Sequence, residues 1–112
     1  MPTNYKVLGQ SNPAATTATT LYTVPSATQA IVSTITVCNQ AATAATYRIA
    51  VRKAGATLAA SQYIAYDVSL PANASDTLTL GITLDYSTAG DIITVYASSA
   101  TMSFAAFGSE IS

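Results

Sequence analysis

Apolar and polar residues alternate with a period of two along most of the chain, and no stretch shows the period of a helix. This alternation predicts β-strands with one buried face over residues 5–9, 20–24, 31–38, 46–53, 62–70, 77–84, 92–97 and 101–107. The residues expected to point inward in the longest runs are Ile31, Ile35 and Val37; Tyr47, Ile49 and Val51; Ile64, Tyr66, Val68 and Leu70; and Leu78, Leu80, Ile82 and Leu84. Val32, Arg48 and Arg52 are expected to point outward.

Short segments that contain Pro, Gly, Asn and Asp separate these runs, as in "LPANAS" and "YSTAGD". About eight short strands with turns between them predict an all-β fold, an antiparallel β-sandwich or jelly roll, in a single domain over residues 1–112. Residues 1–20 are expected to provide an N-terminal strand and a mobile arm, because "SNPAATTATT" at 11–20 is low in complexity.

Charged residues make up only 8% of the chain, and the net charge is -1. An average domain has about 25% charged residues. A chain so close to neutral has no electrostatic attraction to nucleic acid or to an anionic membrane, so neither is expected as a partner. The opening "MPTNYKVLGQ" lacks the pattern of a secretory signal, which favours folding in a cytoplasm.

Residues for catalysis are scarce. The chain has no histidine and one cysteine, Cys38, so neither a Ser/His/Asp nor a Cys/His nucleophile system can form. Nucleotide-binding glycine motifs are also missing, and we therefore expect a protein that is not an enzyme and uses no cofactor. Cys38 is interpreted as a small buried hydrophobic residue.

The stretch "DYSTAGD" is the most suggestive polar cluster, since Asp85 and Asp91 stand six residues apart with Ser87 between them. Carboxylate and hydroxyl oxygens are calcium ligands, which makes the two aspartates weak candidates for a metal site. However, Ala89 offers no oxygen and no Glu closes the loop. The competing interpretation is a hairpin turn in which Gly90 adopts a positive φ and Asp91 opens the next strand.

The expected strand faces are occupied by Thr, Ser and Ala where a soluble monomer would carry Lys and Glu. Covering such neutral faces costs little hydration, so the composition predicts large contacts with other copies or with a scaffold. The expected contact anchors are Tyr5, Tyr22 and Tyr63. A stacking platform for sugars is the alternative use of the tyrosines.

Several segments are similar to a family of short virion proteins of tailed bacteriophages, common among phages of cyanobacteria. The similarity rests on the opening "YKVLGQ", the turn "LYTVPSA" and the closing "FGSEI", and extends through "TYRIAV", "YIAYDVSLPAN", "LTLGITL" and "ITVYASSA". The resemblance implies a β-rich, non-enzymatic particle component that is present in many copies and assembles in the host cytoplasm.

Taken with the neutral faces, the resemblance favours a capsid decoration (cement) protein. Such a protein would form a homo-oligomer, expected as a homotrimer, over the joints between subunits of the major capsid protein. A tail, neck or fibre protein is the alternative within the same class. A β-sandwich that binds host glycans is the alternative from a different class, and it would require a concave face with exposed aromatic residues.

Overall fold

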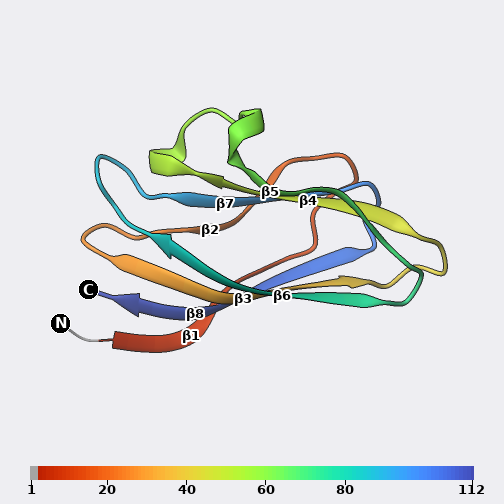
Figure 1. The fold of residues 1–112 in the computed structure, drawn as a ribbon, viewed down its shortest axis with the longest axis horizontal. Helices are drawn as coiled ribbons and strands as arrows, with labels where there is room; N and C mark the ends of the chain where they lie inside the picture. The colour runs from red at the N-terminus through yellow and green to blue at the C-terminus, as the bar shows by residue number, and fades with distance from the viewer. Residues whose placement is uncertain (1–2) are drawn as a thin grey trace.

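The computed structural model describes residues 3–112, apart from the side chain of Leu80. Within this range the chain forms eight strands and two short 3₁₀ helices, Lys53–Gly55 and Ala60–Gln62 (Figure 1). The strands are β1 (Thr3–Ser11), β2 (Thr19–Thr23), β3 (Gln29–Asn39), β4 (Ala45–Arg52), β5 (Tyr63–Leu70), β6 (Ser75–Leu84), β7 (Ile92–Ala97) and β8 (Met102–Ile111). Each of the eight predicted runs overlaps one of these strands.

The strands form two four-stranded antiparallel sheets that lie face to face as two layers (Figure 1). Their strand orders are β1-β8-β3-β6 and β2-β7-β4-β5. The chain crosses between the layers at almost every connection, which is the eight-stranded arrangement of a jelly roll. The predicted fold class, an antiparallel β-sandwich of jelly-roll type, is confirmed.

The core lies between the two sheets and is built from the inward residues of both. Tyr47, Ile49, Leu70 and Leu84 are buried there as predicted, and Leu78 and Ile82 pack against them. The largest fully buried side chains also include Phe104, Ile35, Ile93 and Met102. The rings of Tyr47 and Phe104 meet edge to face across the sandwich, with centroids 6.1 Å apart.

A β-bulge in β3 overturns part of the predicted inward set. Ile31, predicted inward, is 41% exposed, whereas Val32, predicted outward, is fully buried. The pairing register of β3 with both of its neighbours shifts between Val32 and Thr34. An extra residue in one strand reverses the alternation beyond it, so the prediction is right for Ile35 and Val37 and wrong for Ile31.

A second bulge corrects the prediction for β5. Ile64 and Tyr66, both expected in the core, are exposed, while Ala65 is buried. The pairing register with β4 shifts between Tyr47↔Val68 and Ile49↔Ala65, so two residues of β5 lie opposite one residue of β4. Asp67, one of these two residues, has a φ of 49°. Asp is one of the few residues that enters this left-handed region at modest cost.

The segment 11–20, expected as a mobile arm, is hydrogen-bonded to the connection between β7 and β8. The side-chain amide of Asn12 donates hydrogen bonds to the carbonyls of Ala100 and Met102, at 2.9 and 2.6 Å. The backbone N–H of Thr16 donates to the carbonyl of Ala97 at 2.8 Å. The segment connects β1, the N-terminal strand, to β2; residues 1–2 lie outside the described range.

Asn39 closes one end of the sandwich. Its buried side-chain amide donates to the carbonyls of Thr43, Leu70 and Pro71, at 2.9, 3.2 and 3.2 Å. Its side-chain oxygen accepts from the N–H of Ala41 at 3.1 Å and from the hydroxyl of Thr101 at 3.3 Å. One side chain thus joins the loops after β3, after β5 and before β8.

Candidate interaction surfaces

Within residues 3–112 the strand register places no charged side chain on the outer face of sheet β1-β8-β3-β6, and we call it the neutral face. Because directly paired residues of antiparallel strands share a face, the pairings assign each residue to a side. The pairs that point outward are Tyr5↔Ser109, Val7↔Phe107, Ile31↔Ser109, Thr36↔Ala105 and Cys38↔Ser103. On β6 the outward residues include Thr77, Thr79 and Thr83. Tyr5, Val7 and Ile31 are the exposed large apolar side chains of this face.

The acidic side chains of this sheet are turned to its inner side, and the half-exposed Lys6 on the edge strand is paired with one of them. Lys6, Asp76 and Glu110 are the charged residues of its four strands. Glu110 is 8% exposed; one carboxylate oxygen accepts from the hydroxyl of Tyr22 at 2.5 Å, and the other lies 2.6 Å from the ammonium of Lys6. Asp76 accepts from the hydroxyl of Tyr47 at 2.8 Å. Tyr22 and Tyr47 belong to the opposite sheet, so these bonds join the two layers.

The contacts between the layers shift the pKa values of the carboxyl and tyrosine hydroxyl groups in opposite directions. Hydrogen bonds from Lys6 and then Tyr22 lower the pKa of the Glu110 carboxyl below its ordinary value. Burial, followed by the carboxylate that each faces, raises the pKa of the Tyr22 and Tyr47 hydroxyls. Tyr22 is only 7% exposed, so the expectation that it anchors a contact with another protein is wrong.

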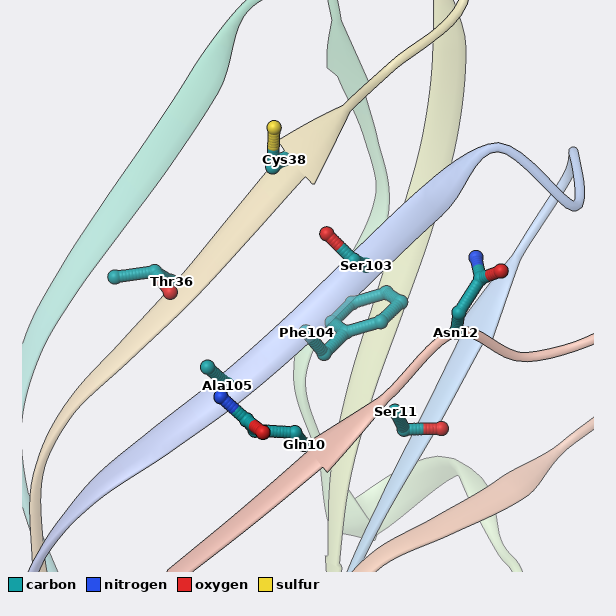
Figure 2. Close-up of a pocket in the computed structure, with 8 residues that line it drawn as sticks. All are labelled: Gln10, Ser11, Asn12, Thr36, Cys38, Ser103, Phe104 and Ala105. Atoms are coloured by element: carbon teal, nitrogen blue, oxygen red, sulfur yellow. The ribbon is translucent and has the colours of Figure 1, made fainter. Parts of the chain in front are cut away.

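Two shallow grooves run along β8 on the neutral face. Figure 2 shows one of about 350 Å³, with Gln10, Thr36 and Ser103 at its walls and the sulfur of Cys38 beside it. Cys38 is half-buried and faces outward, which corrects its interpretation as a buried residue. The second groove, of about 380 Å³, lies between Tyr5, Ile31 and Phe107.

Charged and aromatic side chains gather on the outer face of the other sheet, in a group that we call the tyrosine–arginine cluster: Arg48, Tyr63, Tyr66, Asp67 and Tyr96. The Arg48 guanidinium lies between two tyrosine rings, with its Cζ 4.2 Å from the centroid of Tyr66 and 4.3 Å from that of Tyr96. Both oxygens of Asp67 accept from this guanidinium, at 2.6 and 3.3 Å. Tyr63 meets Tyr66 edge to face at 4.9 Å. Arg48 holds the pKa of the Asp67 carboxyl below its ordinary value.

The two calcium candidates come together, but as a structural contact. The Asp91 carboxylate is buried and accepts from the backbone N–H groups of Ala54 and Asp85, at 2.7 and 3.1 Å. The Asp85 carboxylate lies 3.6 Å from the ammonium of Lys53. Across residues 3–112 there is no group of three or more His, Cys, Asp or Glu side chains placed to hold a metal ion.

The turn between these aspartates differs from its prediction at Gly90. Its φ is not positive, and Gly55 is the glycine with a positive φ. Gly90 is needed instead for close approach, because a Cβ at this position would stand 2.2 Å from the carbonyl oxygen of Val24. Asp91 does directly precede β7, as predicted.

Neither a scan of protein-family models nor a search of curated proteins finds a match to this chain. Among solved structures, the chain is similar to one in the structure of infectious bursal disease virus Gx strain, with a TM-score of 0.52 and 15% sequence identity. The similar region covers 97% of this chain but only 30% of the viral one. At this identity the likeness shows a shared fold.

No helix in the described range is both long and apolar enough to cross a membrane.

Proposed function

We propose that the protein is a non-enzymatic structural component of a virion, present in many copies and attached through its neutral face. The observation that carries this proposal is that Asp76 and Glu110 point inward and that Lys6, half exposed on the edge strand, is paired with Glu110, which leaves the outer side of their sheet without charge. Solvent-facing surfaces normally mix both signs of charge. Covering a neutral face costs little hydration, whereas burying an unpaired Lys or Glu costs several kcal/mol.

The size and chemistry of the neutral face suit a stable contact. Four strands about 4.8 Å apart and ten residues long cover roughly 600 Å². Stable protein interfaces bury about 800 Å² on each partner. Tyr5 is 86% exposed, and Val7 and Ile31 are also exposed, so apolar side chains stand on this face without cover from their own chain. Tyr5 therefore remains our proposed anchor on this side, while Tyr63 lies on the opposite sheet.

Strand β1 adds an open edge to this surface. It is the outermost strand of its sheet, and residues 3–7 are all exposed. Edge strands are commonly protected by outward-pointing lysines or by proline. Residues 3–11 contain no proline, and their one lysine, Lys6, is paired with Glu110. A strand of a second copy can extend this sheet, and a homo-oligomer, first of all a trimer, is the assembly we propose.

Within this class we propose a capsid decoration (cement) protein that covers joints between major capsid subunits. Two likenesses support a particle component: the fold is shared with a chain in a virus structure, and several sequence segments are similar to phage virion proteins. A tail, neck or fibre protein is the second candidate, because a neutral oligomerising face serves those assemblies as well.

A lysine on the neutral face tests the attachment. Ile31→Lys places a charge on an exposed outward position, so it should abolish binding to virions that lack the protein, measured by co-sedimentation, while leaving the melting temperature unchanged. Thr20→Lys is the matched control, because Thr20 is exposed on β2 in the opposite sheet. A wild-type protein that stays monomeric at all concentrations and binds no particle would contradict the proposal.

The location in the particle requires imaging. Electron microscopy of virions that contain the protein fused to a bulky tag should show extra density at three-fold or quasi-three-fold positions of the capsid. Extra density on the tail alone would replace the cement assignment with the tail or fibre assignment. Virions without any extra density would exclude both.

A further inference from the structure

We propose that the tyrosine–arginine cluster, on the sheet opposite the neutral face, is a binding subsite for a neutral sugar. The site is the groove of about 590 Å³ next to the cluster, lined by Leu58, Ala59, Ala60, Tyr63 and Tyr66. Small-ligand sites have volumes of about 300–1,000 Å³ and combine apolar walls with a few fixed polar groups.

The bulge in β5 is the first argument for a binding role. In an unbroken alternation Tyr66 would share the inner face with Val68 and Leu70, and the bulge at Asp67 turns its ring outward. Tyr66 is 57% exposed as a result. Bulges are common at sheet edges and next to active sites, where they re-aim a side chain. Stability alone does not favour moving a large aromatic ring from the core into water.

The rings of the cluster are also held in place before any ligand arrives. Tyr66 is fixed on one side by the Arg48 guanidinium and on another by Tyr63, and Asp67 fixes the guanidinium in turn. A rigid aromatic surface binds with less loss of side-chain entropy than a mobile one. The cluster draws on three neighbouring strands, β5, β4 and β7, so the sheet itself sets its geometry.

The opposite wall of the groove is braced as well. The Gln62 side chain accepts from the N–H of Ala59 at 2.7 Å and donates to the carbonyl of Thr57 at 3.1 Å. Arg52 donates to the carbonyls of Gly55 and Ala56, at 3.1 and 2.7 Å. The loop from 55 to 60 is therefore held against the sheet by side chains at both of its ends.

Charge and hydrogen-bonding capacity select the class of ligand. The five residues that line the groove carry no charge, and the neighbouring Arg48 and Asp67 are paired with each other, so phosphate and nucleic acid gain no attraction there. A sugar ring has an apolar face that stacks on tyrosine and hydroxyls that both donate and accept. Tyr63 and Tyr66, which line the groove, carry hydroxyls that both donate to and accept from sugar hydroxyls. A proline-rich peptide also stacks on tyrosine, but its backbone offers carbonyl acceptors and few donors to the tyrosine hydroxyls.

The inference is independent of the proposed attachment, because the two surfaces lie on opposite sheets. If both hold, many copies fixed by the neutral face would present their clusters outward, and weak single-site binding would gain avidity. Failure of sugar binding would leave the neutral-face proposal standing, and the reverse is also true.

The test uses neutral hexasaccharides of glucose, galactose and mannose, titrated into the full chain at millimolar concentrations with binding followed by NMR. At least one should bind, and Tyr66→Ala should weaken that binding at least about tenfold, because the stacking surface is lost. Tyr66→Phe, which keeps the ring, should retain most of it. Tyr5→Ala is the matched control, since it removes an exposed tyrosine on the neutral face and should change nothing.

Two outcomes would overturn the inference. Either no hexasaccharide binds, or the binding is the same in Tyr66→Ala as in the wild type. Binding of a proline-rich decapeptide at the cluster without any sugar binding would assign the groove to a protein partner instead. The melting temperature of each variant, measured alongside, separates a lost site from a lost fold.

Discussion

The two sheets of this sandwich place their charges on opposite sides. In sheet β1-β8-β3-β6, Glu110 and Asp76 point inward to tyrosine hydroxyls of the other layer, and the outer face is neutral. In sheet β2-β7-β4-β5, Arg48 and Asp67 lie outside on the solvent side, between tyrosine rings. A side chain that remains charged on the outside is adapted to water or to a polar ligand. A face cleared of charge is adapted to a protein neighbour.

This comparison predicts that the inner charges matter far more to stability than the outer ones. Glu110→Ala should show the largest effect, a loss of about 1–3 kcal/mol in the free energy of unfolding. The variant leaves the buried Tyr22 hydroxyl and the Lys6 ammonium without their common acceptor. Urea unfolding measures the loss, and Glu110→Gln, which retains an acceptor oxygen, should lose less. A Glu110→Ala protein as stable as the wild type would break the comparison.

The second prediction is a loss of stability in acid. The folded-state pKa of Glu110 lies below the ordinary value of 4.5, so its contribution is complete above that value and disappears as the pH falls through the folded pKa. Thermal melts from pH 7 down to pH 2 should therefore show a smaller decline for Glu110→Gln than for the wild type. Parallel declines in the two proteins would mean that Glu110 is not the group responsible.

The smallest effect is expected for the outer pair. Asp67→Asn retains a residue that tolerates positive φ and removes only the charge. Exposed ion pairs contribute little, so its urea midpoint should match the wild type within experimental scatter. If this variant lost as much stability as Glu110→Ala, the outer cluster would be a structural brace, and the argument for a ligand there would weaken. The same variant should reduce hexasaccharide binding, which provides a second readout.

The sequence was sufficient to predict the fold class and most of the core. Apolar and polar residues alternate without interruption around Leu78, Ile82 and Leu84 in β6 and around Tyr47 and Ile49 in β4. The inward placement of these residues could therefore be predicted from the period-two alternation alone. The errors at Ile31, Ile64 and Tyr66 all lie next to bulges. A bulge depends on how two strands pair, and neither Ser33 nor Asp67 marks one in the sequence by itself.

The candidate surfaces were less accessible to prediction for the same reason. The lack of charge on strand faces was visible in the composition, and it holds for the sheet β1-β8-β3-β6. The burial of Tyr22 depends on Glu110, which is 88 residues away, and no local pattern connects them. The stacking of Arg48 between Tyr66 and Tyr96 could have been anticipated only from a correct register of three strands.

The junction at Asn39 has a consequence for the order in which the chain folds. Its amide binds carbonyls 31 and 32 residues further along the chain, and its oxygen accepts from a hydroxyl 62 residues away. None of these partners is in place until β3, β5 and the start of β8 have docked, so this end of the molecule should close late. Once closed, it should open only when the whole domain unfolds, and amide protons around Asn39 should be among the slowest to exchange with solvent.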